Sequence, residues 1–255
     1  MAMKRKEQSH DSMKQHEVLQ ELIVLLQNTL NGTSISVSDK QATLLVSHLN
    51  LLMTKNTELN LTAITDVESA LVLHVIDSLL LYPYIEGGSG RLLDIGSGGG
   101  YPGIPLAIMT ERPTTLLDSL TKKTQALESF INELELRESI EVVCARVEEF
   151  AHERPSHYEY VCARAVAPLP VLVEYATPLL CMGGRLVAAK GTPDECEIES
   201  GDKAAEICGL ERLGLYSYAL PQKHGNRTVI VYQKQGDSKI KLPRRIGKAK
   251  KNPLG

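Results

Sequence analysis

The sequence predicts an α/β fold, a mostly parallel sheet covered by helices on both faces, and three observations support this. Short apolar segments alternate with helical patterns from Arg91 onward, which is typical of parallel sheets. A glycine-rich run, GSGGGYPG, follows the first of these segments at 96–103. The last two apolar segments, 213–220 and 227–234, follow each other closely, which indicates an antiparallel pair. We expect one sheet of seven strands.

The part of the chain before this alternation predicts only helices. Helical patterns cover about 12–30, 39–55 and 66–81; a turn signal, Asn31-Gly32, ends the first and a proline at position 83 ends the third. We therefore expect three parts. These are a helical region, residues 1–85, a ligand-binding α/β domain, residues 86–236, and a basic C-terminal tail, residues 237–255.

Within the α/β domain, each strand is short and apolar and is followed by turn residues or a helical pattern. Ligands of such sheets bind beyond the carboxyl ends of the strands. The expected strands are 91–95, 114–118, 140–144, 158–165, 184–190, 213–220 and 227–234, and the expected helices start near 104 or cover 121–136, 169–181 and 195–208.

The glycine-rich run is compatible with two cofactors. Residues 98–103 formally match GxGxxG, the dinucleotide fingerprint. The match begins three residues after the strand instead of directly after it, and it contains Pro102, which removes a backbone donor. A nicotinamide-dependent oxidoreductase therefore stays as an alternative.

The second pattern in the same run is D-x-G-x-G-x-G, which is typical of S-adenosylmethionine-dependent methyltransferases. It is formed by Asp94, Gly96, Gly98 and Gly100. A carboxylate at position 94 would repel a pyrophosphate and attract the ammonium and sulfonium of S-adenosylmethionine. Glycines let the aminoacyl part of that cofactor approach the main chain. We favour S-adenosylmethionine on this charge argument.

Residues at the ends of the next strands also indicate a nucleoside-binding site. Asp118 ends its strand 22 residues after Gly96, where a carboxylate can accept both ribose hydroxyls. Main-chain groups after the third strand, near Val147 and Glu148, could bracket an adenine. Arg164 ends the fourth strand, at the edge of the expected transfer site, although an arginine there could also form an ordinary surface ion pair.

Charge and cysteine content restrict the function further. The net charge is −3, and the stretch 239–255 holds seven Lys or Arg and no acid, so removing it leaves −10. A basic tail on an acidic body suggests contact with an anion, or else a solvated tail. The five cysteines have long, irregular spacings, so we expect buried thiols and no metal site. No signal segment or membrane-spanning run is apparent, which places the protein in the cytoplasm.

Together these motifs resemble the family of ribosomal RNA small-subunit methyltransferase G (RsmG, or GidB). The resemblance covers roughly residues 50–252, and its most specific part is GYPGIPL, residues 100–106. The matching segments, in order, are NLTAITDVESALVLHVIDSLLL, DIGSGGGYPGIPLAI, LLDSLTKK, RVEEF, CARAVAPL, AAKG, RTVIVYQK and LPRRIGKAKKNPL.

The resemblance implies a Rossmann-like class I methyltransferase fold, with a helical N-terminal extension. It implies S-adenosylmethionine as donor and N7 of a guanine in the 530 loop of 16S rRNA, within the small ribosomal subunit, as acceptor. Gly96 and Tyr101 would line the methionine end, and Arg164 the sulfonium side, with a tentative positioning role in catalysis. Together with the motif above, the expected cofactor-binding residues are Asp94, Gly96, Ser97, Gly98, Gly100, Tyr101, Asp118, Ser119, Val147, Glu148 and Arg164.

The RNA would be held by cations near the same strand ends. The expected contacts are Lys122, Lys123, Lys190, Arg227, Arg244 and Arg245. No general base is expected, because guanine N7 carries no proton, and we expect a monomer. His74 and Asp77, on one helix face, could cap or brace the pocket, but we interpret them as a buried hydrogen-bonded pair. A methyltransferase of a small molecule or protein, or a non-enzymatic RNA-binding module, remains an alternative.

Overall fold

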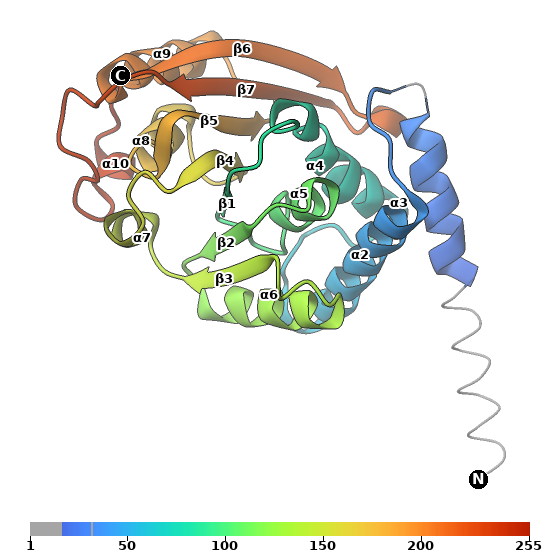
Figure 1. The fold of residues 1–255 in the computed structure, drawn as a ribbon. Coiled ribbons are helices and arrows are strands. Elements are labelled where there is room, and N and C mark those ends of the chain that lie inside the picture. Colours follow the sequence, from blue (N-terminus) through green and yellow to red (C-terminus); the bar gives the residue numbers. More distant parts are fainter. Residues whose placement is uncertain (1–16, 32) are drawn as a thin grey trace, which may run out of the picture.

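The computed structural model describes residues 17–31 and 33–255 and contains one seven-stranded sheet (Figure 1). Its spatial order is β3-β2-β1-β4-β5-β7-β6. The strands are β1 (Leu92–Ile95), β2 (Thr114–Asp118), β3 (Ile140–Cys144), β4 (Tyr158–Arg164), β5 (Leu180–Lys190), β6 (Leu210–Ala219) and β7 (Asn226–Lys234).

The strand directions confirm the predicted mostly parallel sheet. The pairs β1–β2, β2–β3, β1–β4 and β4–β5 are parallel. Strand β7 runs opposite to the other described strands and pairs antiparallel with both β5 and β6. The order reverses beside β1, so the carboxyl ends of β1 and β4 flank the crevice where such sheets bind ligands.

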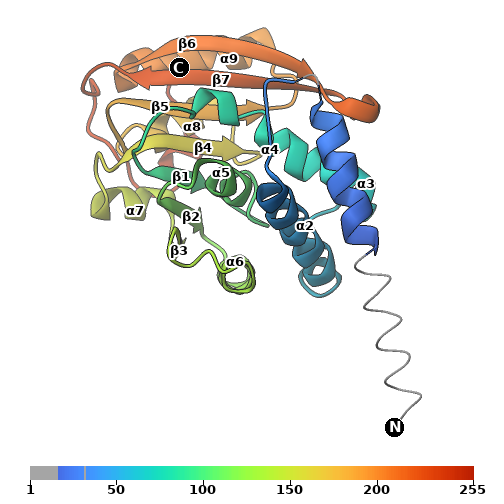
Figure 2. The same cartoon turned by 45° about the vertical axis from the view of Figure 1, so that its right-hand side comes forward.

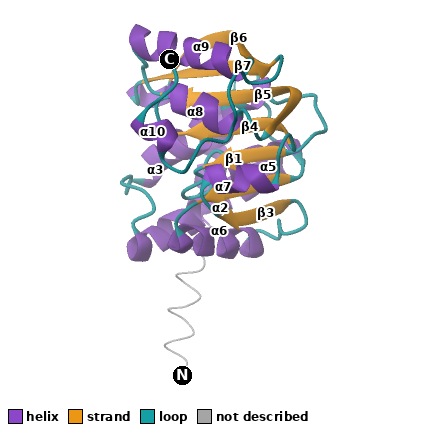
Figure 3. Cartoon of the chain, turned by 90° about the vertical axis from the view of Figure 1, so that its left-hand side faces the viewer, coloured by secondary structure: helices purple, strands orange, loops and turns teal. Residues whose placement is uncertain are grey.

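Helices cover both faces of the sheet (Figure 3). Side chains alternate along each strand, so Leu92 packs in one apolar cluster and its neighbour Leu93 in another. The helices are α2 (Asp39–Leu59), α3 (Val67–Ala70), α4 (Asp77–Leu79), α5 (Gly103–Thr110), α6 (Thr121–Glu133), α7 (Val147–Glu153), α8 (Leu169–Ala176), α9 (Glu195–Cys208) and α10 (Lys248–Lys251).

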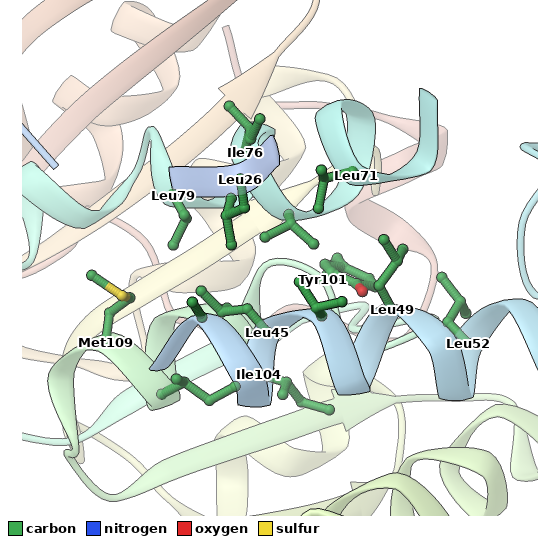
Figure 4. Packing of buried hydrophobic residues seen from close by; sticks show 14 of the residues in the cluster. Leu26, Leu45, Leu49, Leu52, Leu71, Ile76, Leu79, Tyr101, Ile104 and Met109 are labelled. Carbon is green, nitrogen blue, oxygen red and sulfur yellow. The ribbon is translucent and has the colours of Figure 1, made fainter. Parts of the chain in front are cut away.

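The N-terminal helices share a core with the sheet's own helices and do not form a separate one. Residues 17–30 are helical, and α2 begins at the expected cap, Ser38, in a capping box with Gln41. One apolar cluster joins Leu26 and Leu45 of this region to Ile104 of α5 (Figures 2 and 4). The expected helix over 12–16 lies outside the described residues.

The third expected helix is present but is not a regular α-helix. Asp66 caps α3, and Leu71–Ile76 form a π-helical segment before α4. A 3-10 turn, Tyr82–Tyr84, follows it. Residues 67–84 are apolar and long enough to cross a membrane, but half of that segment is buried inside the protein. A core helix therefore accounts for this composition.

Several boundaries differ from the prediction. Helix α8 ends at Ala176 and β5 begins at Leu180, because Pro178 ends the helix early. Two short helices, α7 and α10, were missed, since each is only one or two turns long. The expectation of buried thiols is wrong for Cys144 and Cys196, which are exposed, while Cys162 and Cys208 are buried.

Candidate functional site

The glycine loop after β1 is pinned to the end of β2. Gly96 and Gly98 both have positive φ, 72° and 57°, a conformation that favours glycine. The Gly96 amide donates to the Leu117 carbonyl at 2.7 Å, and the Gly98 amide donates to Asp118 Oδ2 at 3.0 Å. The loop is therefore held by its backbone conformation and by the Asp118 carboxylate, and its glycines leave bare main chain at the crevice.

Asp94 lies beneath this loop. We expected its carboxylate to face the cofactor at the mouth of the site, and this prediction is wrong. Its side chain is fully buried, and Oδ2 accepts from the Gly103 amide at 3.0 Å. Burial raises the pKa of Asp94 to about 7, so its charge is only partial at neutral pH. The carboxylate instead accepts the hydrogen bond of the amide at the start of α5. A cofactor phosphate would need that amide as a donor.

A cavity lies beside the loop, at the carboxyl ends of β1, β4 and β5. Its volume is about 570 Å³. It brings together Gly96, Ser97, Gly98, Tyr101 and Arg164 from the expected cofactor residues. A bare glycine wall with an arginine opposite suits the aminoacyl end of S-adenosylmethionine, whose carboxylate needs a cation and whose backbone-like groups need amides and carbonyls.

A second cavity shares Gly96 with the first as a lining residue. Four further expected residues meet there: Asp118, Ser119, Val147 and Glu148. Both Asp118 oxygens already accept backbone amides, from Gly98 and Leu120, each at 3.0 Å. Each oxygen keeps a second lone pair, so binding to ribose hydroxyls stays a prediction.

Arg164 is fixed in the wall of the first cavity by the N-terminal helices. Its Nη1 donates to the Leu73 carbonyl at 2.6 Å and to Asp77 Oδ2 at 2.9 Å. Arg227 of β7 donates from Nε to the same oxygen at 3.0 Å. Asp77 is buried, so one carboxylate holds two guanidinium groups in the cavity lining.

His74 and Asp77 do not form the expected hydrogen-bonded pair, because Arg164 lies between them. Arg164 Nη2 is 3.3 Å from His74 Nδ1, and His74 Nε2 is 3.0 Å from Thr62 Oγ1. Burial and the nearby guanidinium lower the pKa of His74 to about 4. This histidine is therefore neutral at pH 7 and bridges Arg164 to the loop after α2.

Tyr101 fills the floor of the cavity within a stack of three rings. Its ring centroid is 4.4 Å from that of His48 and 5.0 Å from that of His74. His48 also hydrogen-bonds the Gly99 carbonyl at 2.9 Å, and burial lowers its pKa to about 3. The stack ties α2 to the glycine loop, and Tyr101 lies among the core residues in Figure 4.

The expected RNA-contacting cations divide into two groups. Lys123, Lys190 and Arg227 line the first cavity, whereas Lys122 and Arg245 are exposed outside both cavities. Lys190 also pairs with Glu197 at 2.7 Å. Arg244 is the exception, because it forms a bidentate pair with the buried Glu174. That pair makes Arg244 an internal anchor of the tail.

Sequence reasoning missed the loop that follows α2. Its residues Leu61, Thr62 and Ile64 line the first cavity. No charge or spacing marks them in the sequence, since they lie about thirty residues before the glycine loop. Their place follows only from the packing of α2 against α5 and α6.

The sheet order and the glycine loop define the class I S-adenosylmethionine-dependent methyltransferases. Solved structures agree on the fold. The Bacillus subtilis m1A22 tRNA methyltransferase TrmK has a TM-score of 0.52 and 12% identity, covering 63% of this chain and 66% of its own. Pyrococcus horikoshii TYW2, in complex with MeSAdo, has a TM-score of 0.51 and 13% identity, covering 63% and 62%.

Sequence comparison gives the family. A model of rRNA small subunit methyltransferase G matches residues 41–226. Ribosomal RNA small subunit methyltransferase G of Acetivibrio thermocellus is 39% identical, covering 90% of this chain and 96% of that protein. The Desulfitobacterium hafniense protein of the same name is 38% identical, covering 89% and 95%. The chain therefore belongs to the rRNA small subunit methyltransferase G family and is a methyltransferase that uses S-adenosylmethionine.

Proposed function

We propose that this protein methylates N7 of a guanine in the 530 loop of 16S rRNA, within the small ribosomal subunit, using S-adenosylmethionine. The observation that carries the proposal is the cavity at the carboxyl ends of β1 and β4, where the glycine loop faces Arg164. Ribosomal RNA is the substrate named for the relatives that align over nine-tenths of the chain. We further propose that the protein acts in the cytoplasm as a monomer.

The cofactor, when bound, supplies an electrophilic methyl group on a sulfonium. The glycine loop, Gly96–Gly98, would hold its aminoacyl end against bare backbone, while Asp118 and Ser119 would hold the ribose. Val147 and Glu148 would lie at the adenine, and the guanidinium of Arg164 would face the methionine carboxylate. Asp94 acts indirectly, because it fixes the start of α5 through the Gly103 amide.

The side chains of the first cavity suit a transfer that needs no general base. Guanine N7 attacks with a lone pair, so no proton has to be removed. Among the described residues of this cavity, His74 has a pKa near 4 and Asp77 is held by two arginines. Neither is poised to abstract a proton at neutral pH. Alignment alone can supply about 7–11 kcal/mol of the barrier.

Cations on the rim would hold the RNA backbone. Lys123 and Lys190 line the cavity itself, so they would contact phosphates next to the target base. Lys122 and Arg245 are exposed further out, where they would contribute to general attraction. A cavity that takes one base, surrounded by cations that contact phosphates, fits recognition of a folded RNA.

Transfer of labelled methyl to small subunits from a strain lacking the enzyme tests the proposal. We expect incorporation at one guanine with wild-type protein, and a loss of at least tenfold with Arg164→Ala. Arg212→Ala serves as the matched control, because it removes an arginine that lines neither cavity. Labelling of no ribosomal substrate, or of a small molecule or protein instead, would contradict the proposal.

A further inference from the structure

The C-terminal segment, residues 242–252, folds back onto the protein instead of projecting as a free tail (Figure 1). Arg244 pairs with Glu174, which is only 3% exposed, and Ala249 of α10 is 1% exposed within the apolar cluster that contains Leu93. The Gly247 amide donates to Glu148 Oε1 at 2.8 Å. One face of the segment is therefore docked by an ion pair, an apolar contact and a hydrogen bond.

This docked face reaches the second cavity. Glu148 both lines that cavity and accepts from the C-terminal segment. Lys250 lines the same cavity together with Asp118 and Ser119. It is the residue of the described wall that comes from the C-terminal segment. Lys248, Lys250 and Lys251 are all exposed, but Lys248 and Lys251 line neither cavity.

We propose that Lys250 is a binding residue for the adenosine part of the cofactor, held in place by the docked C-terminal segment. This rests on the proposed placement of adenosine in the second cavity. Two carboxylates, Asp118 and Glu148, offer acceptors there, while the ring nitrogens of adenine need donors. A lysine supplies a donor at its ammonium, and its methylene chain covers the apolar face of the base.

The proposal assigns two roles to the two faces of the basic segment. Its inner face, with Arg244 as the anchor, closes the adenosine end of the cofactor site. Its outer face, with Lys248 and Lys251, stays available to nucleic acid. Cofactor affinity should therefore depend on Lys250 even when no RNA is present, whereas the outer lysines should matter only when RNA is bound.

Calorimetry with S-adenosylhomocysteine and the full-length protein, without RNA, tests this directly. We expect Lys250→Ala to raise the dissociation constant about tenfold, the effect of losing one charged hydrogen bond. Lys251→Ala, which removes the adjacent exposed lysine, should leave it within about twofold. Equal binding by wild-type protein and Lys250→Ala would overturn the proposal.

Amide hydrogen exchange gives a second readout that needs no substitution. Saturating S-adenosylhomocysteine should slow exchange at Gly247 and Asn252, whose amides donate to Glu148 and to the Lys248 carbonyl. Unchanged exchange in this segment would also contradict the proposal. An Asp118→Ala variant distinguishes an error in the role of Lys250 from an error in the proposed cofactor placement. If it weakens binding and Lys250→Ala does not, only the role of Lys250 is wrong; if neither weakens binding, the proposed cofactor placement is wrong.

Discussion

Removing the carboxylate that joins the N-terminal helices to the transfer site should strongly destabilise the protein. Asp77 is 2% exposed, and its Oδ2 lies 2.9 Å from Arg164 Nη1 and 3.0 Å from Arg227 Nε. Breaking a buried ion pair by removing one partner costs about 3–5 kcal/mol. Arg227 is 24% exposed and so recovers some hydration, and Arg164 keeps the Leu73 carbonyl. We therefore expect the lower end, about 3 kcal/mol, for Asp77→Ala.

Urea denaturation followed by circular dichroism measures this loss. An Asp77→Asn variant, which keeps the shape and one acceptor, should lose about 1–2 kcal/mol. The control is Glu206→Ala, which breaks the exposed pair with Lys239 and should leave the urea midpoint unchanged. A loss below about 1 kcal/mol for Asp77→Ala would show that the pair is hydrated and that our reading of the site is wrong.

The remaining predictions concern pH and the glycine loop. His48 and His74 have folded pKa values of about 3 and 4, below the ordinary 6.5, so their stabilisation is complete above pH 6.5 and is lost as the pH falls. Asp94, with a pKa raised to about 7, acts in the opposite sense between pH 4 and 7. The two histidines act together against the one carboxylate, so we expect the unfolding free energy to fall as the pH drops from 6.5 to 4, and Asp94→Asn should steepen this fall in denaturation measured across that range. Gly103→Ala places a Cβ 2.7 Å from the Asp94 carboxylate and should cost about 1–3 kcal/mol, whereas Gly236→Ala, with open space around its Cβ, should leave the melting temperature unchanged; equal melting temperatures for both variants would contradict the geometry.

Local sequence signals predicted the sheet but not the whole site. Strands β2 and β3 have the predicted bounds, because each apolar run is bounded by turn or charged residues. The glycine-rich run and Asp118 predicted which edge of the sheet binds the ligand. The orientation of Asp94 could not be predicted, because it depends on how the loop folds. The folded loop brings the Gly103 amide to the Asp94 carboxylate.

Long-range packing explains what the sequence could not show. The loop at Leu61–Ile64 reaches the cavity only because α2 packs on α5. The basic tail was interpreted from its charge alone, yet a buried acid, Glu174, draws Arg244 inward. Glu174 and Arg244 are far apart in sequence, so the distribution of charge along the chain could not show that they form an ion pair.

Mapping of methylated guanines on 16S rRNA tests the central claim most directly. The rRNA would come from a strain lacking the enzyme, complemented with wild-type protein or with Arg164→Ala. We expect a single N7-methylguanine in the 530 loop with wild-type protein and a signal at least tenfold weaker with the variant. An unmodified 530 loop in the presence of soluble wild-type protein, or equal modification by the variant, would contradict the account.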